Sequence, residues 1–275
     1  MSKNAFLILT HKSIDHIYAY AKFYLDANFY IHLDKKVEIN RINNQDLPNV
    51  HFVEDIDRVD ITWGGFSMVQ ATLNLVRFAL SHDHENSFFH LISGDDVILQ
   101  HEEFLKWESD EIFIENYETI DNRYRLRFNF IHSDTNFQRK FIFKLLTQIF
   151  KKIDFFLVTK KKYYCGSQWF SIKRKELLSL IETINESDIR FFRKKLCPDE
   201  HFFQFILNKS SLKEKISLSG NKRLIIFDKK FQNGSSPLFL NFEQLSNGKD
   251  QGYWFARKVN QDTINQFNRL MLKKY

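Results

Sequence analysis

The sequence predicts an α/β protein in which a Rossmann-type, mostly parallel sheet is flanked by helices. Three apolar runs, residues 5–10, 29–34 and 88–93, have the composition of strands that are buried on both faces. Residues 14–25, between the first two runs, carry apolar side chains at helical spacing, and residues 67–80 do so before the third run. This strand–helix–strand order is typical of parallel, nucleotide-binding sheets.

Composition limits what such a fold can do. The 275 residues can bury a substantial core, and we expect a single domain with a nucleotide-binding half over about 1–100 and an acceptor half over about 101–275. The formal charge of +6 suits an anionic partner: a nucleotide, a nucleic acid or a membrane surface. Cys165 and Cys197 are expected to be free thiols, with a single bridge between them as the alternative. No apolar run has the length of a membrane span, and residues 5–10 are too few for a signal-peptide core.

The first half also carries cap and turn signals. Ser13 can cap the first helix, and Ser67 with Gln70 has the spacing of a capping box at the start of the second. Residues 51–53 are expected to form a further strand. The second helix is expected to bury a stripe formed by Val69, Leu73, Val76 and Leu80.

The third apolar run ends in Ser93, Gly94, Asp95 and Asp96. Gly94 lets the chain turn, and ligands of open α/β sheets bind where parallel strands end. The two carboxylates are therefore candidates for a binding site. The alternative is a turn in which Asp95 or Asp96 caps the next helix.

The second half is predicted to consist of shorter elements. Proline is favoured at the first helical position, so Pro198 indicates a helix start that places Asp199 and Glu200 near the positive end of the helix dipole. Without further information, these carboxylates would only complement that dipole. The other expected elements are strands at 111–115, 125–130, 163–172 and 224–227, a helix at 175–184, a mostly irregular stretch at 239–252, and a last helix after residue 259.

A basic amphipathic helix is expected over residues 137–153. One interpretation places this helix on an anionic membrane. The other, which is the commoner arrangement, packs its apolar stripe against the body of the protein and leaves its lysines in water. The stripe consists of Phe137, Phe141, Leu145, Ile149 and Ile153, and the basic residues among them are Arg139, Lys140, Lys144, Lys151 and Lys152.

Seven short motifs give the chain a resemblance to a known family. In these motifs it resembles the core-2/I-branching β-1,6-N-acetylglucosaminyltransferase family, which also includes the peptide O-xylosyltransferases, from Ala5 to about Val259. Each motif is weak alone, but all seven occur in family order. They are Thr10-His11-Lys12, Ile31-His32-Leu33-Asp34-Lys35-Lys36, Trp63-Gly64-Gly65-Phe66-Ser67, Leu91-Ile92-Ser93-Gly94-Asp95-Asp96, Gly166-Ser167-Gln168-Trp169-Phe170, Pro198-Asp199-Glu200-His201 and Phe255-Ala256-Arg257-Lys258.

The resemblance implies a glycosyltransferase-A-like fold and an inverting transfer from a UDP-sugar to a hydroxyl group. The expected donor carries GlcNAc, with UDP-xylose or another UDP-hexose as the alternative. The family neutralises the diphosphate with basic side chains, so we expect neither a metal nor another cofactor. Asp96 is accordingly assigned to positioning the donor sugar or its loop, since Asp95 and Asp96 lack the spacer of an Asp-x-Asp metal motif.

The resemblance also implies roles for individual residues. Glu200 matches the family's catalytic base, because an inverting displacement needs one carboxylate to accept the acceptor proton. The diphosphate is expected to meet Arg223 and Lys258, with Lys222 and Arg257 as their alternatives. The uracil is expected at Asp34, in a pocket that is also lined by Thr10, His11 and Trp63.

Acceptor contacts are implied for a glutamate and an arginine after the central strand. Glu115 or Glu118, together with Arg123 or Arg125, matches them, and Trp169 is expected either to stack on a sugar or to be a core residue. The chain looks like a short bacterial-type member, so we expect a cytoplasmic enzyme, peripheral on the membrane, that builds surface polysaccharide or lipopolysaccharide on a glycan or lipid-linked glycan, with no nucleic-acid partner. The competing hypothesis is a non-catalytic basic protein that binds membrane or nucleic acid.

Overall fold

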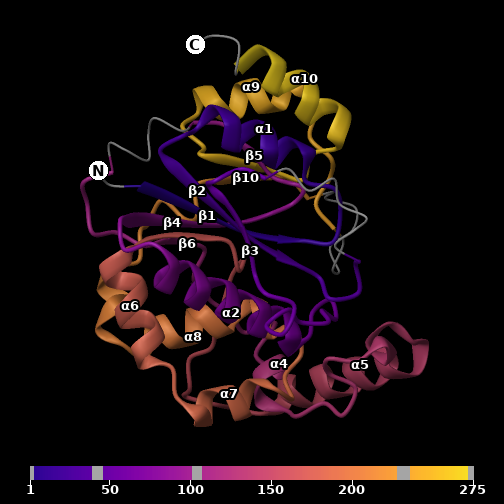
Figure 1. Ribbon diagram of the computed structural model, residues 1–275. Helices are drawn as coiled ribbons and strands as arrows, with labels where there is room; N and C mark the ends of the chain where they lie inside the picture. The colour runs from indigo at the N-terminus through magenta and orange to yellow at the C-terminus, as the bar shows by residue number, and fades with distance from the viewer. Residues whose placement is uncertain (1–2, 39–45, 101–106, 228–235, 272–275) are drawn as a thin grey trace.

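A six-stranded sheet forms the centre of the computed structural model, which describes residues 3–38, 46–100, 107–227 and 236–271 (Figure 1). Its strand order is β3-β2-β1-β4-β9-β6. The first four strands are mutually parallel, and β9 runs antiparallel to both of its neighbours. The predicted α/β class with a mostly parallel sheet is therefore confirmed. The strands are β1 (Lys3–Thr10), β2 (Ala27–Leu33), β3 (Val50–Phe52), β4 (Asn86–Ser93), β6 (Phe113–Ile114) and β9 (Phe170–Lys173).

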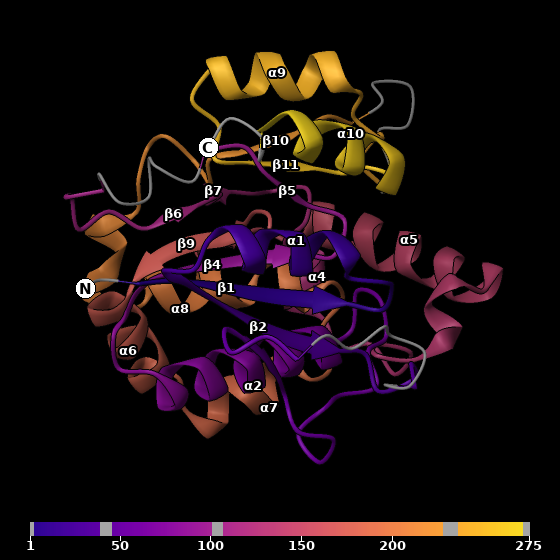
Figure 2. The same ribbon diagram turned by 45° about the horizontal axis from the view of Figure 1, so that its top comes forward.

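Helices cover both faces of this sheet. Figures 1 and 2 show α1, α9 and α10 on one side and α2, α6 and α8 on the other. Strand β1 alternates between the two cores: Phe6 and Ile8 pack on the α1 side, whereas Leu7 and Leu9 pack on the α2 side. This two-sided burial is why the strand has an unbroken apolar sequence. The helices are α1 (Asp15–Phe23), α2 (Phe66–His82), α6 (Arg174–Thr183), α8 (Phe202–Asn208), α9 (Phe242–Asp250) and α10 (Gln261–Met271).

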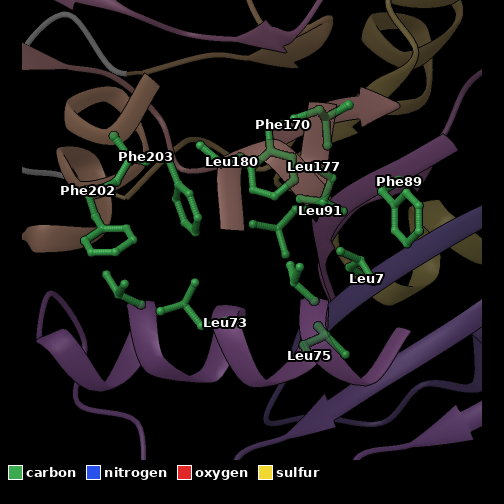
Figure 3. Packing of buried hydrophobic residues seen from close by; sticks show 14 of the residues in the cluster. Leu7, Leu73, Leu75, Phe89, Leu91, Phe170, Leu177, Leu180, Phe202 and Phe203 are labelled. Atoms are coloured by element: carbon green, nitrogen blue, oxygen red, sulfur yellow. The ribbon is translucent and has the colours of Figure 1, made fainter. Parts of the chain in front are cut away.

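The core on the α2 side joins the two halves of the chain. Leu73 of α2 points toward Phe202 and Phe203 of α8, and Leu75 and Leu91 lie farther along the same core (Figure 3). Phe202 and Phe203 are fully buried. Because α8 follows the Pro198 segment directly, this packing fixes that segment against the sheet.

Two smaller sheets complete the fold. One has the order β10-β11-β5, and its apolar residues pack with those of α9 and α10. The other pairs β7 with β8 in antiparallel orientation. Their strands are β5 (Val97–Ile98), β7 (Tyr117–Glu118), β8 (Tyr164–Cys165), β10 (Arg223–Ile225) and β11 (Phe255–Arg257).

The segment predicted as a strand at 125–130 is instead a short helix, α4 (Tyr124–Arg127). Arg123 and Arg127 both form ion pairs with Asp154, and a helical turn brings them to the same side. An extended strand would separate the two arginines by about 13 Å. The remaining elements are α5 (Phe141–Phe156), α7 (Glu186–Phe192), η2 (Asn136–Arg139), η3 (Pro198–Glu200) and η4 (Ser211–Lys215).

The structure also corrects the expected helix caps. Helix α2 begins at Phe66, and Ser67 does not cap it: its hydroxyl accepts from the Thr62 amide and donates to Asp134. Ser13 likewise forms a hydrogen bond with the side chain of Asp15 and leaves Ile14 in the N-cap position of α1. In both places a nearby side chain competes for the hydroxyl.

Residues 239–252, expected to be irregular, contain α9. Its N-terminus is a capping box in which Asn241 accepts from the Gln244 amide and the Gln244 side chain accepts from the Asn241 amide. Among the described residues, no helix is both long and apolar enough to cross a bilayer.

Candidate active site

The carboxyl ends of the parallel strands line one cavity of about 780 Å³. Thr10 and Ser93 are the last residues of β1 and β4, and Asp34 comes directly after β2. The sequence predicts this placement for a sheet of this kind. The second half of the chain supplies the facing walls. From that half, the residues relevant to the site are Glu115, Trp169, Asp199, Glu200, Arg223, Arg257 and Lys258.

The loop after β4 is held tightly against β1. A side chain at position 94 would collide with Thr10, so the close approach of the two strand ends requires Gly94. Asp96 turns away from the cavity and is buried, accepting hydrogen bonds from the amide and hydroxyl of Ser93. Asp96 therefore stabilises this loop from its buried side.

Three cations line the same part of the cavity. The Lys12 ammonium lies 2.9 Å from Asp95, and that of Lys258 lies 3.3 Å from the same carboxylate. Arg257 forms a 2.9 Å ion pair with Asp96 and donates to Ser93. Burial alone would raise the pKa of Asp95, but Lys12 and Lys258 outweigh it and hold that pKa below its usual range. Of these cations, Lys12 was not assigned a role from the sequence, although it belongs to the motif Thr10-His11-Lys12 at the end of β1.

Trp169 supports this cation group. The guanidinium of Arg257 lies over its ring, 4.5 Å from the centroid, and the Trp169 side chain is almost fully buried. The face of the indole is therefore covered by a residue of the same chain. This geometry favours the core alternative for Trp169 over stacking on a sugar.

Arg223 lines the cavity, but its guanidinium is occupied by hydrogen bonds to the backbone. It donates to the carbonyls of Asn221, Leu91 and Phe170, and burial lowers its pKa to about 9. Its alternative, Lys222, lies with its ammonium 5.8 Å from the ring centroid of Phe113. Of these two residues, only Arg223 lies at the cavity wall.

Glu200 lies at the end of η3, where Pro198 occupies the first turn as predicted. Its carboxylate forms an ion pair with Arg125 from α4 and remains 44% exposed. The Glu200 carbonyl accepts from the amide of Gly166, where any side chain would collide with the backbone of Glu115. Three segments that are distant in sequence thus fix this carboxylate at the cavity.

Asp199 is the partner of Glu200 in this wall. Burial, with the Glu200 carboxylate beside it, raises the pKa of Asp199 to about 7. Within the described residues, its Oδ1 atom has no hydrogen-bond partner. The raised pKa favours the protonated form of the Asp199 carboxyl group.

The expected acceptor residues divide into two groups. Glu115 lines the cavity, and its carboxylate accepts from the Ser167 amide at 2.7 Å. Its alternative Glu118 forms a surface ion pair with Lys162. Neither Arg123 nor its alternative Arg125 is among the described residues that line the cavity: Arg123 binds Asp154 at 2.6 Å, and Arg125 is connected to the site by its ion pair with Glu200.

The four residues expected at the uracil all line the cavity: Thr10, His11, Asp34 and Trp63. The Asp34 carboxylate accepts from the amide of Lys36 at 3.0 Å, and Trp63 is 57% exposed.

The sequence model of the family described as Core-2/I-Branching enzyme matches residues 4–248, which is most of the chain. The search of curated proteins gives no match to the chain.

Proposed function

The chain belongs to the Core-2/I-Branching enzyme family of glycosyltransferases, and from this premise we propose that it transfers GlcNAc from UDP-GlcNAc to a hydroxyl of a glycan, with inversion at the anomeric carbon. The observation that carries the proposal is one cavity with cations on one wall and the Asp199–Glu200 pair on another. Family membership favours this catalytic role over a non-catalytic binding protein.

Glu200 is the proposed general base. In a single displacement, the acceptor oxygen attacks the anomeric carbon while one carboxylate removes its proton. The partial exposure of Glu200 leaves it accessible to an acceptor, and the ion pair with Arg125 orients it. Asp199, which shares its wall, is proposed to hold a proton and thereby limit the negative charge beside the base.

Lys12, Arg257 and Lys258 are proposed to neutralise the leaving diphosphate. Enzymes of this family work without a metal. In this chain Asp95 and Asp96 are each engaged by cations, which supports charge neutralisation by side chains and leaves neither carboxylate available as a simple metal ligand. Arg223 is proposed to position the strand ends next to the diphosphate, because its donors bind backbone carbonyls.

The remaining cavity residues are assigned to the uridine and to the acceptor. Asp34, Thr10, His11 and Trp63 are proposed to receive the uridine, and Glu115 to contact the acceptor. The proposed acceptor is a glycan carried on a lipid, as in the synthesis of surface polysaccharide or lipopolysaccharide, with the protein at the inner face of the membrane. A donor with xylose or another hexose is the alternative.

The test is UDP release from a panel of UDP-sugars, with chelator present throughout. UDP-GlcNAc is expected to be hydrolysed fastest, with UDP-xylose, UDP-glucose and UDP-galactose slower. Faster release from UDP-xylose would show that the donor is UDP-xylose and would leave the proposed type of reaction unchanged. Release from none of these donors, by a folded protein, would contradict the proposal.

A further inference from the structure

Helix α5 contacts the rest of the protein along only one narrow face. Phe143, Thr147, Phe150 and Asp154 form this face: the rings of Phe143 and Phe150 contact His132, Phe128 and Phe130, and Asp154 is the only fully buried residue of the helix. In Figures 1 and 2 the helix lies at the edge of the molecule and extends outward from α4. The structure therefore corrects the expectation that the apolar stripe of this helix packs on the body.

A second, wider apolar stripe on α5 faces away from the body. At 100° per residue, its members are centred about 140° from the packed face, so the two sets cannot be covered by the same neighbour. The exposed fractions are large for a folded protein: 80% for Phe141, 62% for Ile142, 49% for Leu145, 47% for Ile149, 44% for Ile153 and 80% for Phe156.

Lysines border this exposed stripe. Lys140, Lys144 and Lys152 are exposed on α5 or at its start, and none of these three forms an ion pair among the described residues. The loop beyond the helix adds Lys160 and Lys161, whereas Lys162 in the same loop is paired with Glu118. The only acidic residue within α5, Asp154, is turned inward to Arg123 and Arg127. The outer side of α5 therefore combines aromatic and aliphatic groups with uncompensated positive charge.

We propose that α5 docks the protein on an anionic membrane surface. In this arrangement the helix lies in the plane of the interface with Phe141, Ile142 and Phe156 inserted at the headgroup boundary, and the lysines contact acidic headgroups. A helix with a strong apolar face and a basic border is the type that binds to bilayers in this way.

The charge pattern favours a membrane over a second copy of the chain. A two-fold symmetric dimer through α5 would bring the same lysines of both copies together, which is repulsive. An anionic bilayer instead attracts each lysine and accepts the apolar stripe.

The docking would orient the cavity toward the membrane. The arrowheads of β1 and β2 in Figure 2 point toward the side on which α5 lies. Asp154 of α5 binds Arg123 and Arg127, and Arg125 between them binds Glu200. This last step, presentation of Glu200 to a lipid-linked acceptor, rests on the proposed function, whereas the docking does not.

Vesicle co-sedimentation of the full chain tests the docking. We expect binding to vesicles of phosphatidylcholine with 30% phosphatidylglycerol, and at least tenfold weaker binding to phosphatidylcholine alone. The triple variant Phe141→Ser/Ile142→Ser/Phe156→Ser should lose binding. Its matched control is Leu25→Ser/Ile56→Ser/Leu218→Ser, which removes exposed apolar residues elsewhere and should bind like wild type.

The contribution of the lysine charges to binding is tested separately. Two further measurements on every variant show that the protein is folded and still binds UDP. Lys144→Gln and Lys152→Gln should each weaken binding to anionic vesicles by about fivefold, and salt should do the same. Circular dichroism and UDP affinity of every variant should match wild type, so a failure of docking is distinguishable from a failure of the proposed reaction. No binding of wild type to anionic vesicles, or a dimer in light scattering that the α5 triple variant dissolves, would overturn the proposal.

Discussion

The two charged walls of the cavity are built on opposite principles. On the wall formed by the strand ends and β11, Lys12 and Lys258 share the single carboxylate Asp95, so positive charge is in excess. On the wall formed by η3, Arg125 faces the two carboxyl groups of Asp199 and Glu200, so among the described residues of this wall acidic groups outnumber basic ones.

This difference matches the two demands of an inverting transfer. A leaving diphosphate supplies the negative charge that the first wall lacks, and the second wall supplies a carboxylate that can accept the proton of the acceptor. Changes to the two walls should therefore separate substrate binding from proton transfer.

The largest effect is expected on the acidic wall. Glu200→Gln keeps the size of the side chain but cannot accept a proton, so turnover should fall by about 10²–10⁴-fold. UDP affinity should remain close to wild type, because the base is proposed to face the acceptor and not the diphosphate. Steady-state turnover and calorimetry on the same preparation measure both quantities.

Asp199→Asn is the matched control for this variant. It neutralises the neighbouring carboxyl group and should reduce turnover much less, because Asp199 is proposed to carry a proton already. A Glu200→Gln enzyme that keeps more than about a tenth of wild-type turnover would assign the base to another carboxylate, with Asp199 as the next candidate.

The basic wall should respond in the opposite way. Lys258→Ala should weaken UDP binding by roughly 1.5–3 kcal/mol, the scale of a lost hydrogen bond to a charged group. Turnover at saturating donor should fall less than it does in Glu200→Gln. The same substitution at the exposed Lys213 is the control and should leave UDP affinity unchanged. If the Lys258 and Lys213 variants bind UDP with equal affinity, Lys258 does not contact the diphosphate.

The last effect concerns the pH dependence of stability. The pKa of Asp199 is raised in the folded state, so the stabilisation of its neutral form is complete below its ordinary pKa and is lost as pH rises toward about 7. Between pH 5 and pH 8, the wild type should lose up to about 2–3 kcal/mol more stability than Asp199→Asn, which appears as a lower Tm at the higher pH. Parallel thermal melts of both proteins measure this, and identical pH slopes would mean that Asp199 is ionised throughout.

The strands were predictable because burial on both faces gives an unmistakable composition. Residues 5–10, 29–34 and 88–93 all lie in the large sheet, and their ends meet at the cavity. The segment 125–130 was predicted wrongly because alternating arginines and apolar residues fit a strand and a short helix equally well. The helix is favoured because it lets Arg123 and Arg127 both pair with Asp154, which lies far along the chain.

The site was predictable only in part, for a similar reason. Motifs identified Glu200 and Lys258, but nothing local indicates that Arg125 reaches Glu200 across 75 residues, or that Arg257 covers Trp169. The spacing of apolar residues in α5 predicted a helix correctly, yet periodicity gives the face of a helix and not what covers it.

Binding of UDP to the wild-type protein, measured by calorimetry with and without EDTA, tests most directly whether the basic wall is a metal-free diphosphate site. We expect UDP to bind at one site per chain, with an affinity that EDTA leaves within about twofold and that Lys258→Ala weakens by at least tenfold, the equivalent of about 1.4 kcal/mol. The absence of binding heat, or binding that EDTA abolishes and Mn²⁺ restores, would contradict this and would make Asp95 and Asp96 the candidate metal ligands.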